Sequence, residues 1–363
     1  MTLVSLLNNI KESLLTKELI NRSIKSNRLN ISGGSLSTRA LISSAIAKKE
    51  KRPLLIIVPT IEEATRWLSI LELMGWKRSY LYPTSESSPY DALDTTSEIS
   101  WGQLQVLSEL KEDLIKEELA VVCTERSLQP HLPPPEFFFD HCYQLVVGDE
   151  LDLKIISSEL TGLGYKRVKT IENEGEWSRR GDILDIYPVS CELPIRLEFF
   201  GDQLEKIKEF DPISQRSLDV IDKINLTPTS INQLIAAKLR VQIPGVLPKI
   251  LGEKSFNDLI EGKTPSGLRR LIGLAWSAPS SLIDYFPINT CIVADEKKQA
   301  LAHGQAWLEH ANENYQEILD SLQTINSTEN IILPGNLHKD ITECFDELST
   351  YFGFETAEIF EED

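Results

Sequence analysis

The sequence predicts an α/β fold with a parallel sheet and a smaller, mostly antiparallel β domain (α+β). Strand and helix signals alternate through residues 1–132, which indicates a parallel sheet covered by helices on both faces. Residues 136–226 change to short strands separated by turns, and helices return in residues 230–363. From these signals, the last block could form its own domain or complete the first sheet, with the β block as an insertion.

In the first block, apolar runs mark strands, and apolar residues at three- and four-residue spacing mark helices. Leu54–Val58 is a continuous aliphatic run and predicts a buried strand. The next helix carries Trp67, Leu71 and Met74 on one face. The block is predicted to contain strand 29–32, helix 39–49, strand 54–58, helix 61–74, strand 79–82, helix 101–110 and strand 119–123. Leu132-Pro133-Pro134-Pro135 then marks a linker.

The middle block has the turn-rich pattern of an antiparallel sheet. In Ile195–Phe199 apolar residues alternate with charged ones, so we expect one buried and one solvated face. Turn signals such as Asn173-Glu174-Gly175 and Gly201-Asp202 separate the runs. Strands are predicted at 165–171, 176–180, 183–187, 195–200 and 204–210. A second linker is expected at Leu226–Thr229.

The last block is predicted to contain strands 290–294 and 330–333 and a long amphipathic helix at 297–322. Asp295-Glu296 follows the first of these strands, where nucleotide hydrolases place the acidic motif that holds Mg²⁺ and activates water. This placement supports a rejoined sheet. Alone, the dipeptide fits a solvated helix start better, because acidic residues favour the positive end of a helix dipole.

A loop at residues 31–40 has the setting of a phosphate-binding loop but lacks several of its residues. It follows a strand and opens a helix, where a nucleotide-binding sheet places G-x-x-x-x-G-K-[ST]. With Gly33 on the first glycine, Thr38 takes the second, Arg39 the lysine and Ala40 the hydroxyl residue. Thr38 restricts the backbone, Arg39 is a bulkier planar fork than lysine, and a methyl group cannot ligate Mg²⁺.

We therefore interpret this region as a degenerate nucleotide site (degenerate Walker A) formed by Gly33, Gly34, Thr38, Arg39, Asp295 and Glu296. No catalytic residue is expected in it, and no cofactor, ATP included. Taken alone, however, the two glycines fit an ordinary strand-to-helix turn better.

Composition narrows the function classes. A chain of 363 residues exceeds one ordinary core, so two or three domains are expected. The formal net charge of −18 argues against non-specific nucleic-acid binding and favours a protein partner. Five cysteines without C-x-x-C and five unclustered histidines predict no metal site. Without a signal peptide or a membrane-spanning apolar run, a cytoplasmic chain with no membrane contact is expected.

Several motifs recur in a fixed order along essentially the whole chain. They are Ser32–Leu41, Val58–Glu63, Pro89–Leu93, Leu132–Pro134, Arg179–Pro188, Arg196–Asp202, Phe210–Arg216 and Asp284–Pro287. In this order they resemble the N-terminal module of bacterial transcription-repair coupling factor, which is similar to the B subunit of nucleotide excision repair. The resemblance implies a helicase-like sheet formed by two chain halves, 1–132 and 230–363, with the β domain 136–226 inserted between them.

The resemblance also implies a partner. The β domain of that B subunit docks the A subunit of excision repair (UvrA), the damage-recognising ATPase, and Arg167 and Arg180 match arginines of that contact. Lys166 and Arg179 are basic neighbours, while Trp177 could be an interface anchor or a core residue. Charges of both signs occupy this stretch, so the residues alone fit a self-neutralising solvated face better. The resemblance reverses that preference, and arginine suits such an interface.

The DNA-clamping hairpin of the B subunit is not expected here, because residues 84–97 hold one aromatic side chain, Tyr90, and several acidic ones. By the same resemblance, the motor that makes the full-length family an ATP-dependent DNA translocase lies beyond this module. RNA polymerase and DNA are therefore expected as partners only through those further domains. The favoured function is a non-catalytic adaptor that recruits the A subunit to RNA polymerase stalled at DNA lesions. The alternative is an active ATP-dependent helicase or translocase lobe.

Overall fold

The computed structural model describes residues 2–25, 29–85, 90, 96–111, 118–242, 245, 247–325 and 337–359. The chain divides into two compact units. The first, here the α/β unit, comprises Met1–Asp91, Glu109–Leu132 and Ala278–Asp363. The second, here the β unit, comprises Ala92–Ser108 and Pro133–Ser277. Each unit thus combines segments that lie far apart in the sequence.

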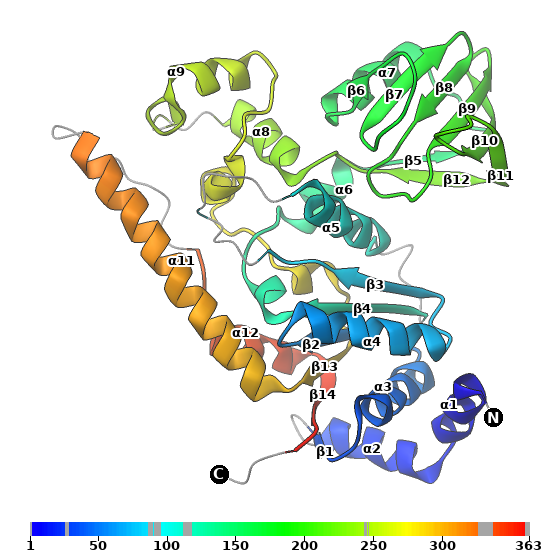
Figure 1. Ribbon diagram of the computed structural model, residues 1–363, viewed down its shortest axis with the longest axis vertical. Coiled ribbons are helices and arrows are strands. Elements are labelled where there is room, and N and C mark those ends of the chain that lie inside the picture. Colours follow the sequence, from blue (N-terminus) through cyan, green and yellow to red (C-terminus); the bar gives the residue numbers. More distant parts are fainter. Residues whose placement is uncertain are drawn as a thin grey trace. The chain divides into compact units, whose positions relative to one another are not determined.

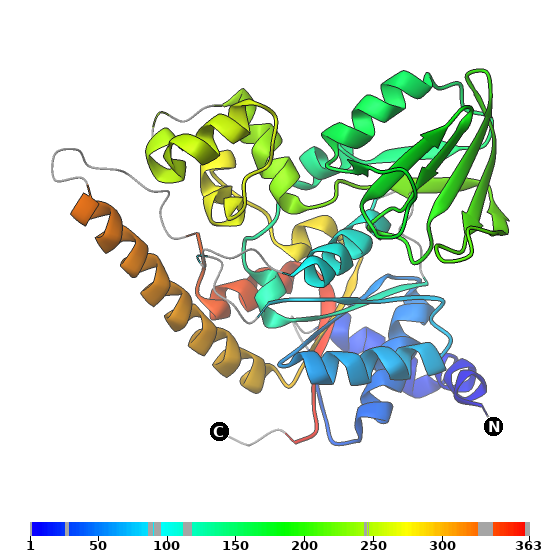
Figure 2. The same ribbon diagram turned by 45° about the horizontal axis from the view of Figure 1, so that its top comes forward.

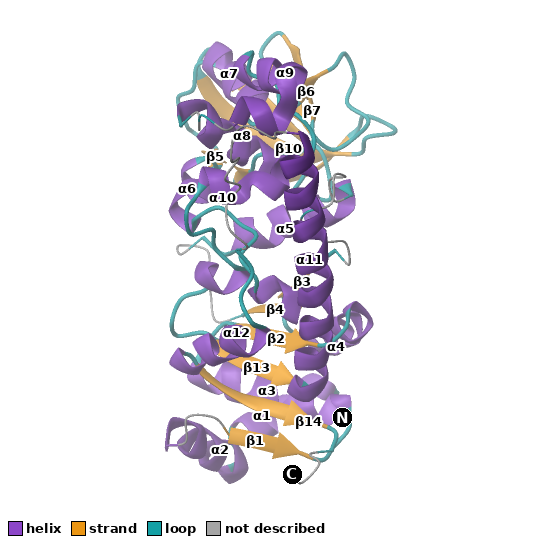
Figure 3. Cartoon of the chain, turned by 90° about the vertical axis from the view of Figure 1, so that its left-hand side faces the viewer, coloured by secondary structure: helices purple, strands orange, loops and turns teal. Residues whose placement is uncertain are grey.

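The α/β unit is built on a six-stranded sheet whose neighbouring strands all run parallel, in the order β1-β14-β13-β2-β4-β3. Its strands are β1 (Leu29–Ser32), β2 (Leu54–Val58), β3 (Arg78–Tyr82), β4 (Leu119–Thr124), β13 (Cys291–Asp295) and β14 (Phe352–Ala357). Figure 3 shows β13 and β14 lying between β2 and β1. The predicted fold class, with a parallel sheet formed by both halves of the chain, is confirmed.

Four helices of the first half share one core with this sheet. They are α1 (Leu3–Lys11), α2 (Leu14–Lys25), α3 (Leu36–Glu50) and α4 (Ile61–Leu73). The apolar face of α4, with Trp67 and Leu71, packs against alternate residues of β2 such as Ile56. Thr60 caps the N-terminus of α4, and its side chain accepts a hydrogen bond from the Glu63 N–H at 3.2 Å.

The second half adds α11 (Lys297–Ile325), α12 (Ile341–Glu347) and the short 3₁₀ turns η3 (Leu282–Tyr285) and η4 (Leu348–Thr350), and η1 (Glu125–Leu128) follows β4. The sequence analysis predicts no strand at residues 352–357, where the structure has β14. The predicted strand 330–333 lies outside the described residues, and so does most of segment 84–97. Among the described residues, no helix has both the length and the apolar composition to cross a membrane.

The β unit holds a six-stranded sheet in the order β11-β10-β9-β8-β7-β6 and a two-stranded sheet, β12-β5. Neighbouring strands are antiparallel except β6 and β7, which run parallel. The strands are β5 (Tyr143–Val146), β6 (Lys166–Arg167), β7 (Glu176–Arg180), β8 (Ile183–Ile186), β9 (Ile195–Phe200), β10 (Gln203–Phe210), β11 (Ser217–Ile221) and β12 (Lys223–Leu226).

Helix α7 (Leu153–Gly162) covers one face of the larger sheet (Figures 1 and 2). Its Ile156 and Leu160 share a core with Leu184 and Leu197. The remaining helices of the unit are α5 (Ser97–Glu109), α6 (Pro135–Asp140), α8 (Ile231–Val241), α9 (Leu247–Ile260), η2 (Leu268–Leu271) and α10 (Ile272–Ala275). Residues 230–277, which the sequence analysis groups with the last α/β block, thus cluster with the β sheet.

Candidate functional sites

The β1–α3 loop of the α/β unit is the predicted degenerate nucleotide site. Gly33 and Gly34 have positive φ angles of 78° and 122°, which favour glycine and turn the chain into α3. The Gly33 N–H donates to the carbonyl of Glu358 at 3.2 Å. The Thr38 side chain lies beside Gly34, where an added Cβ would meet it at 3.2 Å. Its hydroxyl is 3.3 Å from that of Ser35, so the loop contacts its own side chains.

Arg39 forms a buried ion-pair group with the acidic dipeptide at the end of β13. Its Nε lies 2.9 Å from Oδ1 of Asp295, and its Nη1 lies 3.1 Å from Oε1 of Glu296. Its Nη2 also donates to Oδ2 of Asp295 at 3.4 Å. The structure therefore brings together the side chains that stand for the lysine and the acidic motif. Arg39 forms an ion pair with both acidic side chains directly.

Two further side chains hold the Asp295 carboxylate. The indole N–H of Trp67 in α4 donates to Oδ2 at 2.8 Å, and the hydroxyl of Thr356 in β14 donates to Oδ1 at 2.6 Å. Burial raises the pKa of Asp295 above its ordinary value, while these hydrogen bonds and the charge of Arg39 oppose the shift. The sequence analysis did not include Trp67 or Thr356 in the site.

Glu296 is equally engaged. Its backbone has a φ of 49°, its N–H donates to the carbonyl of Thr356 at 2.9 Å, and its carboxylate accepts the N–H of Glu358 at 2.7 Å. Both acidic side chains are thus occupied by protein donors. Among the described residues, no cluster of three or more His, Cys, Asp or Glu side chains could hold a metal ion.

The basic residues predicted to bind a partner lie on β6 and β7 of the β unit. Because side chains alternate along a strand, Trp177 and Arg179 share one face of β7, whereas Arg180 belongs to the other face with Ser178. Arg167 is paired with Trp177, and its guanidinium lies 5.2 Å from the centre of the indole ring. The predicted cluster is therefore divided between two faces at one edge of the sheet.

Trp177 is 3% exposed and belongs to the apolar core under α7. The sequence left open whether Trp177 is an interface anchor or a core residue. The structure places it in the core, so it is not an exposed anchor. Lys166 and Arg167 are exposed on the edge strand β6, and Arg179 is half-buried and donates to the carbonyl of Gly181 at 3.1 Å.

Arg180 is exposed, with 59% of its side chain accessible to solvent. Its Nη2 lies 3.5 Å from Oδ2 of the buried Asp185. Asp185 has a better partner in Arg196, which donates to its two oxygens at 2.7 and 3.0 Å. That hydrogen-bonded pair raises the pKa of Arg196. Arg196 is thus a structural partner of Asp185, and Arg180 extends to the solvent beside them.

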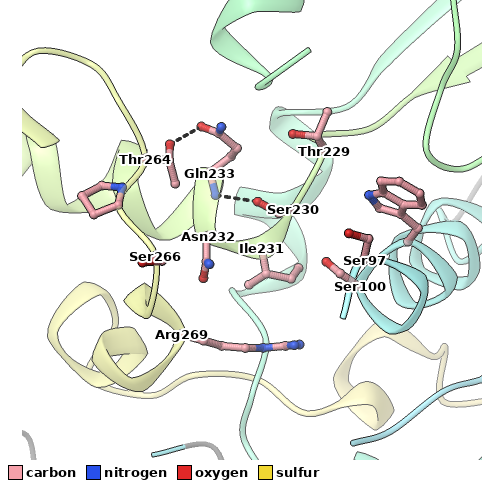
Figure 4. Close-up of a pocket in the computed structure, with 12 residues that line it drawn as sticks. Ser97, Ser100, Thr229, Ser230, Ile231, Asn232, Gln233, Thr264, Ser266 and Arg269 are labelled. Carbon is pink, nitrogen blue, oxygen red and sulfur yellow. Dashed lines mark hydrogen bonds between the residues drawn. The ribbon is translucent and has the colours of Figure 1, made fainter. Parts of the chain in front are cut away.

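The β unit also contains a cavity of about 310 Å³ near the first turns of α5 and α8 (Figure 4). The Thr264 hydroxyl donates to the side chain of Gln233 at 2.6 Å, and the Gln233 N–H donates to Ser230. Arg269 donates to Gln103 at 2.5 Å. Several polar residues of the cavity lining are thus bonded within the protein, and none of the predicted site residues lines the cavity.

Comparison with known proteins supports the motif-based resemblance. Residues 143–231 match the family described as UvrB interaction domain. A transcription-repair-coupling factor of Bacillus subtilis (strain 168) is 29% identical over 309 residues, which cover 79% of this chain and 26% of the relative. Its counterpart in Haemophilus influenzae is 26% identical over 317 residues, covering 86% of this chain and 27% of the relative. The transcription-repair-coupling factor of Escherichia coli (strain K12) is 26% identical over 261 residues, which cover 70% of this chain and 22% of the relative.

The chain spans about a quarter of the length of these curated relatives. The match to the interaction domain covers the large β sheet and both strands of the small one, which places Arg167 and Arg180 inside the matched region. The resemblance is confirmed: over most of its length this chain is similar to transcription-repair-coupling factors, and its β sheets are similar to the UvrB interaction domain.

Proposed function

We propose that this chain is a non-catalytic recruitment module that docks the A subunit of nucleotide excision repair through its β unit. The observation that carries the proposal is the match of residues 143–231 to the UvrB interaction domain. The similarity to transcription-repair-coupling factors indicates where this docking would act, namely in the repair of lesions at which RNA polymerase has stalled. Contacts with RNA polymerase and DNA would be made by domains that the resemblance assigns to the rest of the protein.

The exposed arginine on β7 supports this surface physically. Arg180 needs little reorganisation to meet a partner carboxylate, because Asp185 keeps its closer pair with Arg196. A guanidinium also presents a planar fork that can bind a carboxylate in a bidentate manner. We therefore propose Arg180 as the principal charge contact of the docking surface. Arg167, which lies against the Trp177 ring, would contribute less.

The ion-pair group in the α/β unit supports the non-catalytic part of the proposal. A phosphate would have to compete with Asp295 and Glu296 for Arg39, and Mg²⁺ would have to displace Arg39 from the two acids. Both exchanges expose a buried charge without its partner, which is costly. The α/β unit is therefore proposed to serve as a platform that binds no ATP.

A charge reversal tests the docking surface. We expect Arg180→Glu to weaken binding of the purified A subunit by roughly thirtyfold or more, because loss of a buried interface charge pair costs about 2–5 kcal/mol. Arg167→Glu should weaken binding less. Calorimetry or a pull-down measures this effect.

Lys223→Glu is the matched control, since it makes the same charge change at an exposed strand position of the other sheet of this unit. It should bind like the unmodified chain. The melting temperature of Arg180→Glu should stay within a few degrees of the original. Unchanged binding by Arg180→Glu, or its unfolding, would show that this arginine is not the docking contact.

A further inference from the structure

Several large apolar side chains are exposed on the face of the larger β-unit sheet that carries Arg180, and Ile183 and Phe200 are those nearest to it in register. Phe200, at the end of β9, is 74% exposed, and Ile183, at the start of β8, is 38% exposed. The other face of the sheet is the one that packs under α7. An exposed phenylalanine next to an exposed isoleucine is costly in water and needs a reason.

Strand register places these side chains together. Arg180 pairs with Ile183 across the β7–β8 turn, and Ile183 pairs with Glu198 on β9. Phe200 lies two residues beyond Glu198, so it shares that face and is a diagonal neighbour of Ile183. Its neighbour Phe199 points into the core with Leu204. We call Arg180, Ile183 and Phe200 the Phe200 surface.

The surroundings of the Phe200 surface carry charges of both signs, and the exposed Asp182 and Asp202 lie in the turns next to Ile183 and Phe200. Lys206 on β10 is exposed and pairs with Glu198. Lys208 forms an ion pair with the same glutamate, with 2.6 Å between Nζ and Oε1. Glu198, the residue paired with Ile183, is thus already neutralised by Lys208, while Arg180 and Lys206 lie exposed beside the surface.

We propose that Phe200 and Ile183 form the apolar centre of the docking surface, inserted into an apolar pocket of the partner whose edge carries a carboxylate for Arg180. This inference rests on the proposed function and extends it from a charge contact to a hot spot. Aromatic and arginine side chains dominate such hot spots, and a charged rim around an apolar centre is the usual anatomy of an interface. We take the A subunit as the occupant, because Ile183 and Phe200 adjoin Arg180, the proposed charge contact, within the residues that match the UvrB interaction domain.

The test compares Phe200→Ala with Ile155→Ala in the full chain. Ile155 is an apolar residue, 61% exposed, on α7, which covers the opposite face of the sheet. Phe200→Ala should weaken binding of the purified A subunit about thirtyfold, and Phe200→Leu should weaken it less. Ile155→Ala should bind like the unmodified chain. The melting temperature should not fall in any of these variants, because neither side chain is buried.

The outcomes separate this inference from the proposed function. Loss of binding in Arg180→Glu together with full binding by Phe200→Ala would refute the apolar centre and leave the docking proposal intact. If the unmodified chain fails to bind the A subunit at all, both ideas are wrong. If Phe200→Ala instead dissolves a dimer of this chain in sedimentation experiments, the face is a self-interface and the inference fails.

Discussion

Arg39 stands where a phosphate-binding loop has its lysine, and the proposed loss of nucleotide binding depends on its contacts. The sequence indicates that the lysine of the loop is missing, but it does not indicate where the replacing guanidinium goes. The structure pairs Arg39 with Asp295 and Glu296, and adds hydrogen bonds from Trp67 and Thr356 to the first of these acids. These partners are separated by up to several hundred residues, so only the assembled sheet can bring them together.

Removal of this guanidinium should destabilise the α/β unit. Arg39→Met would leave Asp295 buried without its cation, and breaking one side of a buried ion pair costs about 3–5 kcal/mol. Chemical denaturation at neutral pH measures the loss. The double variant Arg39→Met/Asp295→Asn should recover much of it, because no uncompensated buried charge remains at Asp295. Equal stability of the single variant and the unmodified chain would contradict a structural role for the pair.

The stability of the single variant Arg39→Met should depend on pH in a defined direction. Burial already raises the pKa of Asp295, and loss of Arg39 removes one of the groups that oppose that shift. The folded variant then binds a proton at a higher pH than the unfolded chain does. Its free energy of unfolding should therefore rise as the pH falls from about 8 towards about 5. A deficit that is constant over this range would argue against protonation of Asp295.

At the scale of elements, strands with strong local patterns are predictable and strands defined by distant partners are not. Leu54–Val58 is a continuous aliphatic run and is found as β2. In contrast, β14 contains Gly353, Glu355 and Thr356, so its sequence lacks an apolar run, although it lies between β1 and β13. Its place is determined by pairing with strands from elsewhere in the chain.

The division of the basic residues between two faces of the sheet is also determined by strand pairing. The sequence predicts one strand at 165–171, but the structure forms only the short strand Lys166–Arg167, and Val168 and Ile171 join a small separate core. The parallel pairing of β6 with β7 then puts Arg167 beside Trp177 and away from Arg180. A list of nearby arginines in the sequence cannot show this division.

Gly353 is the residue that should most strongly limit the packing of β14. A Cβ at this position would lie 2.1 Å from the carbonyl oxygen of Ile292 in the neighbouring strand β13. Gly353→Ala should therefore lower the free energy of unfolding by about 2 kcal/mol or more, since the strands must separate locally. Gly162→Ala, in helix α7, makes the same chemical change with no atom within 4 Å and should be neutral or slightly stabilising. Thermal unfolding compares the two, and equal melting temperatures would disprove the steric argument.

At the scale of the whole molecule, the two halves of the chain together form the parallel sheet and its Arg39 ion-pair group. Thr38 and Arg39 come from the first half, whereas Asp295, Glu296 and Thr356 come from the second, and they meet only in the completed sheet. The sequence could predict the defective loop from Thr38, Arg39 and Ala40. It could not predict that the acidic motif would be used to hold the arginine.

This arrangement predicts that Mg·ATP does not bind the intact chain. A ligand present at a hundred times its Kd stabilises a folded protein by about 2.7 kcal/mol. Millimolar Mg·ATP should therefore raise the melting temperature of a chain with a working nucleotide site by several degrees. We expect no shift and no ATP hydrolysis. Arg39→Lys keeps the positive charge with a smaller head group and is the comparison variant. Binding gained only by Arg39→Lys would support closure of the site by Arg39, and a shift or turnover in the unmodified chain would instead favour the active ATPase lobe.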